Sequence, residues 1–114
     1  MTPDDFRRLA LSQPKAVEVY RWGRSEFRVL RRSFASLEGP AIATVQLTWE
    51  GQAMFMHAAQ RIFVPVPGGW GRLGATNVVL AYAYEAIVKS ALMVAWHNIV
   101  PKSLVKSTDE PTYG

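Results

Sequence analysis

The chain has 114 residues, of which 49% are hydrophobic and 19% charged, and its formal net charge is +4. This composition is typical of a globular domain without low-complexity segments. The chain has no cysteine, which excludes disulfides, thiol catalysis and cysteine-ligated metals. No apolar run reaches the roughly 18 residues of a membrane span, and the N-terminus lacks a signal-peptide core. We therefore expect a cytoplasmic protein without a membrane partner.

Capping residues predict the first helix, and the spacing of apolar residues predicts the first strands. Thr2 and Pro3, followed by two acids, begin a helix that should stop near Gln13, because Pro14 disfavours helical geometry in the residue before it. From residue 17 to residue 48 apolar residues alternate with a period of two, which is typical of strands. Three core strands are expected here, one containing Phe27 and Val29, then residues 34–37 and 42–47. A further short strand around Val19 is an open alternative.

The first core hairpin has a basic tip. If Arg31 and Arg32 form the tip, Val29 lies opposite Phe34 and both point into the core. A two-residue turn needs positive φ at both tip positions, which arginine tolerates poorly. We therefore expect a slightly longer loop.

The second half of the chain is predicted to contain two helices around a glycine-rich loop. Thr48 caps a helix over residues 49–59, a short extended piece follows at residues 62–64, and a last strand covers residues 76–82. A final helix over residues 84–100 ends before Pro101. Its broad apolar arc predicts packing on the sheet through Leu92, Ala95, Trp96 and Ile99. We expect one domain over residues 1–104 and a polar tail over residues 105–114.

The glycine-rich loop over residues 65–80 contains two prolines, four glycines, Trp70 and Arg72. Gly69, Gly71 and Gly74 match the dinucleotide-binding pattern, but a strand is expected after them instead of a helix, and no acid follows at the required distance. Four glycines in seven positions predict at least one positive φ. The loop is either a structural corner or a platform for a ligand.

Taken together, these motifs resemble the MmcQ/YjbR family over roughly residues 2–104. The matching segments are residues 11–14 (LSQP), 27–29 (FRV), 34–37 (FASL), 47–48 (LT), 66–68 (VPG), 77–78 (NV), 95–96 (AW) and 101–104 (PKSL). The resemblance implies an α+β fold in the order α-β(3)-α-β(2)-α, with a mainly antiparallel sheet like that of secretion chaperones. Our interpretation of the periodicity gives the same order. The resemblance also implies DNA binding, since the family's hairpins are compared to a double wing.

Five arginines within residues 21–32 are opposed there only by Glu26, which predicts a positive patch with phosphates or acidic proteins as partners. The predicted nucleic-acid-binding residues are Arg24, Arg28, Arg31, Arg32, Trp70 and Arg72. An alternative is that the arginines are paired with Glu18, Glu26 or Glu38 across the sheet. Two other functions stay open: a chaperone-like module, monomeric or homodimeric, that binds a polypeptide, and a small-ligand site at Trp70 and Arg72.

Enzymatic chemistry is poorly supported by the sequence. The two histidines, His57 and His97, have no acid at helical spacing, and Ser90 is two helical turns from His97, too far to act as a nucleophile with that base. The carboxylates form no recognisable acid–base pair. We predict a binding protein without catalytic activity, cofactor or metal.

Overall fold

The computed structural model describes residues 1–101. The elements, in chain order, are α1 (Pro3–Leu11), β1 (Val17–Arg21), β2 (Arg24–Val29), β3 (Arg32–Leu37), β4 (Ile42–Gln46), α2 (Trp49–Ala58), β5 (Phe63–Pro65), α3 (Gly69–Arg72), β6 (Ala75–Val79), a 3-10 turn (Leu80–Tyr82) and α4 (Glu85–Ile99). The predicted tail over residues 105–114, and the predicted domain end at residue 104, lie outside the described residues.

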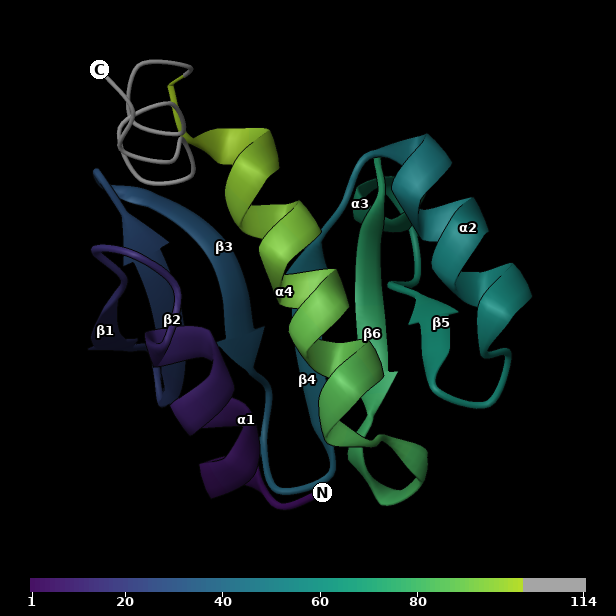
Figure 1. Cartoon of the computed structure of the whole chain (residues 1–114), viewed down its shortest axis with the longest axis horizontal. Helices are drawn as coiled ribbons and strands as arrows, with labels where there is room; N and C mark the ends of the chain where they lie inside the picture. Colours follow the sequence, from purple (N-terminus) through teal and green to yellow (C-terminus); the bar gives the residue numbers. More distant parts are fainter. Residues whose placement is uncertain (102–114) are drawn as a thin grey trace, which may run out of the picture.

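The strands form one six-stranded antiparallel sheet in the order β1-β2-β3-β4-β6-β5. Figure 1 shows α1, α4 and α2 in front of this sheet and α3 behind it. The predicted α+β class and the packing of the C-terminal helix are confirmed. The order differs from the prediction in three respects. Four strands precede α2 instead of three, because residues 17–21 pair with β2 along their whole length. The short helix α3 separates β5 from β6, and residues 80–82, predicted as the end of the last strand, form the 3-10 turn.

Local capping explains where the helices begin. The Thr2 hydroxyl accepts a hydrogen bond from the backbone N–H of Asp5, and the Asp5 side chain accepts one from the N–H of Thr2, which completes a capping box. Thr48 caps α2 in the same way through the N–H of Gly51. Both caps are at the predicted positions.

The core lies between the sheet and α1 and α4. Trp96, Phe6, Phe27 and Phe34 are all fully buried there. In α4 the residues predicted to face the sheet do so: Leu92, Ala95 and Trp96 are buried, and Ile99 is partly buried against the same core. Among residues 1–101, no helix is both long and apolar enough to cross a membrane.

The basic hairpin differs from the prediction at its tip. Val29 pairs with Arg32 instead of Phe34, so the tip is the two-residue pair Leu30–Arg31, with φ of 51° and 72°. The expected longer loop is wrong. A bulge in β3 explains the register: Phe27 pairs with Ala35 and Arg28 with Ser33, which leaves Phe34 as the extra residue. Packing of Phe34 in the core therefore outweighs the unfavourable φ values at the tip.

Candidate nucleic-acid interface

The face of the sheet opposite α1 and α4 is polar across its centre. Directly paired residues of antiparallel strands point to the same side. A single row of such pairs crosses the whole sheet: Val19, Glu26, Ser36, Thr44, Asn77 and Val64. Four of these six side chains can form hydrogen bonds. We call this side of the sheet the open face.

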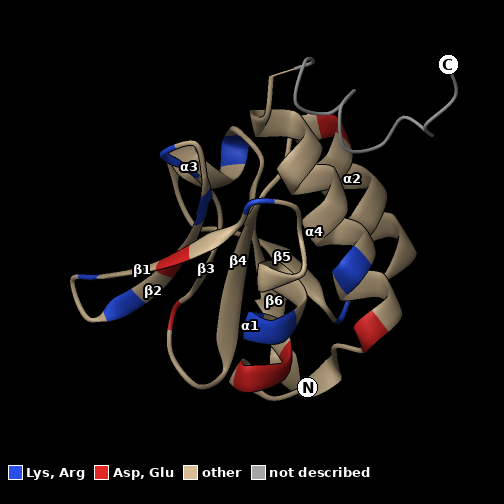
Figure 2. Cartoon of the chain, turned by 60° about the vertical axis from the view of Figure 1, so that its left-hand side comes forward, with Lys and Arg blue, Asp and Glu red and all other residues tan. Residues whose placement is uncertain are grey.

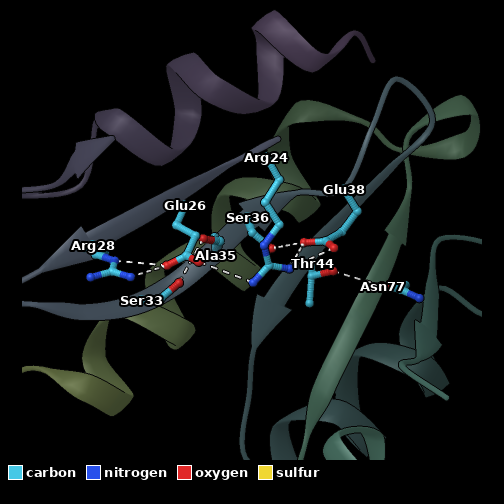
Figure 3. Close-up of polar contacts among 9 residues, drawn as sticks. All are labelled: Arg24, Glu26, Arg28, Ser33, Ala35, Ser36, Glu38, Thr44 and Asn77. Atoms are coloured by element: carbon cyan, nitrogen blue, oxygen red, sulfur yellow. Dashed lines mark hydrogen bonds and ion pairs between the residues drawn. The ribbon is translucent and has the colours of Figure 1, made fainter. Parts of the chain in front are cut away.

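An ion-pair network occupies the β2–β3 half of the open face (Figure 3). Arg24 donates to both carboxylate oxygens of Glu38, at 2.6 and 2.9 Å, and to Glu26 at 3.3 Å. Arg28 donates to Glu26 from the other side, with an Nε–Oε1 distance of 3.0 Å. The Ser36 hydroxyl donates to Glu38. The alternative considered from sequence is thus observed for Arg24 and Arg28, while Glu18 pairs with Arg7.

Glu26 is the centre of this network. It is buried, with only 8% of its surface exposed, and it lies between two guanidinium groups. The hydrogen bond from Arg28, supported by the charges of Arg28 and Arg24, lowers the pKa of the Glu26 carboxyl although burial opposes the shift. The folded protein therefore prefers the ionised carboxylate, which adds stability above the ordinary pKa of 4.5.

Glu26→Gln should lower the free energy of unfolding by about 2 kcal/mol at pH 7, because its charge-assisted hydrogen bonds from Arg24 and Arg28 weaken. The lowered pKa means that the wild type loses this contribution as the pH falls from 4.5 through the folded pKa, so the two proteins should converge only below the folded pKa. Urea denaturation across the pH range measures the difference. Glu50→Gln is the control, because Glu50 has no ion pair within residues 1–101. An E26Q difference that does not depend on pH would contradict this role of the carboxylate.

A concavity of about 550 Å³ on the open face begins at this network and extends across β4 to β6 and α3. Trp70 of α3 lines it, and its polar lining comes from Arg24, Ser36, Glu38, Thr44, Gln46 and Asn77. The side chain of Trp70 is 72% exposed although it borders this hollow. We call this site the open-face concavity. The volume lies within the range of ligand sites, roughly 300–1,000 Å³.

The glycine-rich loop fixes α3 at the edge of the concavity. Gly68 and Gly74 have φ of 87° and 115°, which confirms the predicted positive φ. A Cβ on Gly71 would lie 1.8 Å from the carbonyl oxygen of Val66, so the backbone approach there requires glycine. The buried amide of Gln52 donates to the carbonyl oxygens of Gly71 and Ala75, at 2.9 and 3.1 Å. The loop is therefore a structural corner, and this corner also presents Trp70 to the open face.

The structure brings together some of the predicted site residues and separates others. Arg24 and Trp70 line the same concavity. Arg72, two residues along α3, instead lines a different hollow, with Trp49. Arg31 is at the tip of the β2–β3 hairpin, and Arg32 donates to the carbonyl oxygen of Ile99 at the end of α4, at 3.2 Å. Arg28 is held by Glu26 next to the concavity.

Sequence reasoning missed the polar residues of the concavity, Thr44, Gln46 and Asn77. For Thr44 and Gln46 the sequence did contain a signal. Alternation in β4 places them with Ile42 on one face of the strand, opposite the buried Ala43 and Val45. The contact of Thr44 with Asn77, at 2.9 Å, joins residues 33 apart in sequence and depends on the pairing of β4 with β6.

These features define a small α+β protein with α1, α2 and α4 on one side of an antiparallel sheet and a polar open face, bordered by α3, on the other. No family model matches the sequence, and no curated protein matches it. The chain is similar to the crystal structure of the Deinococcus radiodurans protein DR2400, described as a DUF419 domain, with a TM-score of 0.69 and 18% sequence identity. The similarity covers 96% of this chain and 89% of that one. DUF419 is the MmcQ/YjbR family, so the likeness agrees in fold with the resemblance noted from sequence.

Proposed function

We propose that this protein binds DNA without catalysing a reaction, and that arginines at the projecting ends of the sheet contact the phosphate backbone. The observation that carries the proposal is the uneven pairing of charges. Within residues 1–101, ion pairs with carboxylates involve Arg7, Arg8, Arg24 and Arg28, and none involves Arg21, Arg31, Arg32 or Arg72.

The arginines that have no carboxylate partner among residues 1–101 are at or beside turns. Arg21 ends β1 next to a two-residue turn, Arg31 is a hairpin tip residue, and Arg72 ends α3. Figure 2 shows the β1–β2 hairpin and α3 projecting on the same side of the molecule, with basic residues on both. Projecting cations that remain unneutralised suit contact with a phosphate backbone, which binds through charge and counterion release.

Replacing both Arg31 and Arg32 with glutamine should reduce the salt dependence of DNA binding. Each phosphate neutralised contributes about 0.9 to the slope of log K against log salt for duplex DNA. The double variant should therefore flatten that slope by up to about 2. Fluorescence anisotropy with a labelled duplex, titrated at several salt concentrations, gives the slope.

The control for this experiment removes the same net charge elsewhere. Arg61→Gln with Lys89→Gln changes two cations outside the proposed interface, one in the turn between α2 and β5 and one in α4, and it should leave the slope close to that of wild type. Exposed charges contribute little to stability, so both double variants should fold. A wild-type protein without salt-sensitive DNA binding at low ionic strength, or equal slopes for the two double variants, would contradict the proposal.

Polypeptide binding is the second candidate, and the exposed edge of the sheet favours it. β1 has a neighbour on one side only and contains no proline, so its outer backbone groups can pair with an added strand. Val17 and Tyr20 are exposed on this strand. If the salt titration shows no DNA binding, polypeptide binding at β1 becomes the better supported function.

A further inference from the structure

We propose that the open-face concavity holds one unpaired base of a DNA strand, stacked on Trp70, and that the protein therefore prefers single-stranded to duplex DNA. The inference rests on the proposed function. It also names the part of the nucleic acid that enters the open-face concavity. Three observations carry it: the rigid exposed tryptophan, the free hydrogen-bonding groups beside it, and the distribution of charge between the floor of the concavity and its surroundings.

Trp70 is a flat ring held on a rigid support. It is 72% exposed, yet the next residue, Gly71, is locked against the carbonyl of Val66 and held by the amide of Gln52. A large apolar ring that borders a polar hollow, on backbone that cannot easily shift, is pre-organised for a planar partner. Nucleobases stack on such rings whatever their identity, because every base has a π-face.

Hydrogen-bonding groups of the concavity are available for the edge of a base. The Oδ1 atom of Asn77 accepts from the Thr44 hydroxyl at 2.9 Å, which orients the amide and leaves its Nδ2 as a donor (Figure 3). Within residues 1–101, neither this Nδ2 nor the side-chain amide of Gln46 has a hydrogen-bond partner. Both residues line the concavity with Trp70. A base in a duplex cannot use this site, because its pairing edge is occupied and both its faces are stacked.

The charges favour a neutral base inside the concavity and phosphates outside it. Glu38 lines the concavity and Glu26 adjoins it, and both are already satisfied by Arg24. A phosphate placed there would meet two carboxylates, and the one cation among the described lining residues, Arg24, is already paired with both of them. The arginines that have no carboxylate partner within residues 1–101 lie elsewhere: Arg21 and Arg72 on the projecting β1–β2 hairpin and α3, and Arg31 at the tip of the β2–β3 hairpin. Proteins that bind single strands combine aromatic rings that stack on the bases with cationic groups that follow the phosphate backbone.

The test compares three labelled DNA oligonucleotides of equal length by anisotropy: a single strand, a duplex, and a single strand with abasic linkers in place of bases. Trp70→Ala should weaken single-strand binding by at least about fivefold. It should change duplex and abasic binding by less than about twofold. Asn77→Ala should weaken single-strand binding in the same direction. Trp49→Ala is the matched control, since Trp49 is similarly exposed, at 64%, and lines another hollow.

The outcomes separate a wrong stacked base at Trp70 from an absence of DNA binding. If wild type binds all three oligonucleotides equally, and Trp70→Ala has no effect while the Arg31 and Arg32 double variant flattens the salt slope, the stacked base is overturned and DNA binding stands. An equal loss for Trp49→Ala and Trp70→Ala also overturns the stacked base. If no oligonucleotide binds at low salt, both proposals fail. Because Trp70 is exposed, its replacement should not prevent folding.

Discussion

Replacing Gly71 with alanine is expected to lower the free energy of unfolding by about 3 kcal/mol or more. The added Cβ would lie 1.8 Å from the carbonyl oxygen of Val66 and 2.9 Å from its carbonyl carbon. Both atoms belong to the backbone, so no side-chain rotation relieves the overlap. The corner would have to open, which would also separate the Gly71 carbonyl from the amide of Gln52.

Gly69→Ala is the control, because Gly69 is in the same short helix and a Cβ there meets nothing within 4 Å. Its free energy of unfolding should stay within about 1 kcal/mol of wild type, since alanine is a better helix former than glycine. Chemical denaturation followed by circular dichroism measures both variants. Similar stabilities for the two would show that the loop adjusts freely and that Gly71 is not a steric requirement.

This contrast also explains the dinucleotide-like pattern of glycines. In a dinucleotide-binding site the glycines allow a pyrophosphate to approach the backbone, and a helix follows. Here Gly71 allows Val66 to approach, and Gly74 allows Leu47 to approach, with a Cβ–oxygen distance of 2.0 Å. The element that follows is strand β6, as the sequence predicted. Here, glycine therefore allows two backbone segments to pack closely, whereas in a dinucleotide-binding site it allows a ligand to approach the backbone.

Features set by neighbouring residues could be predicted from the sequence. The capping hydroxyls of Thr2 and Thr48 act within three residues, and the apolar arc of α4 follows from helix geometry alone. The strand alternation likewise separated the core residue Phe27 from Arg28. Each of these depends on local chemistry and periodicity, which one sequence displays directly.

Features set by strand register could not be predicted. The tip at Leu30 and Arg31 goes against turn preference, and only the bulge at Phe34 explains it. The partners of Arg24 illustrate the same limit, because Glu38 is 14 residues away and the two meet only when β2 and β3 pair as they do. A cluster of arginines in sequence therefore became two paired residues and a set of projecting ones.

The role of Gln52 had no visible signal in the sequence. It is one of three polar residues in α2, with Glu50 and His57, and its amide reaches carbonyls 19 and 23 residues along the chain. The open-face concavity has the same origin, since β2, β3, β4, β6 and α3 all contribute to it. The glycines around Trp70 mark it as a candidate site residue in the sequence. Asn77 becomes a candidate only when the pairing of β4 with β6 places it beside Thr44.

Trp96→Ala is expected to lower the free energy of unfolding by about 3–5 kcal/mol. The side chain is fully buried between α4 and the sheet and is among the largest in the core. Its Nε1 also donates to the carbonyl oxygen of Pro14 at 2.9 Å, which ties α4 to the segment after α1. The variant would lose both the packing and this hydrogen bond. Chemical denaturation monitored by circular dichroism measures the loss.

Two further variants separate these contributions. Trp96→Phe keeps most of the apolar contact but removes the donor, so it should cost about 1–3 kcal/mol, less than the alanine variant. Trp22→Ala is the control at the opposite extreme, because Trp22 is 89% exposed at a hairpin turn, and its stability should change by less than about 1 kcal/mol. Wild-type stability in Trp96→Ala would place this ring on the surface and contradict the packing of α4. Equal losses for the phenylalanine and alanine variants would instead assign the effect to the hydrogen bond with Pro14.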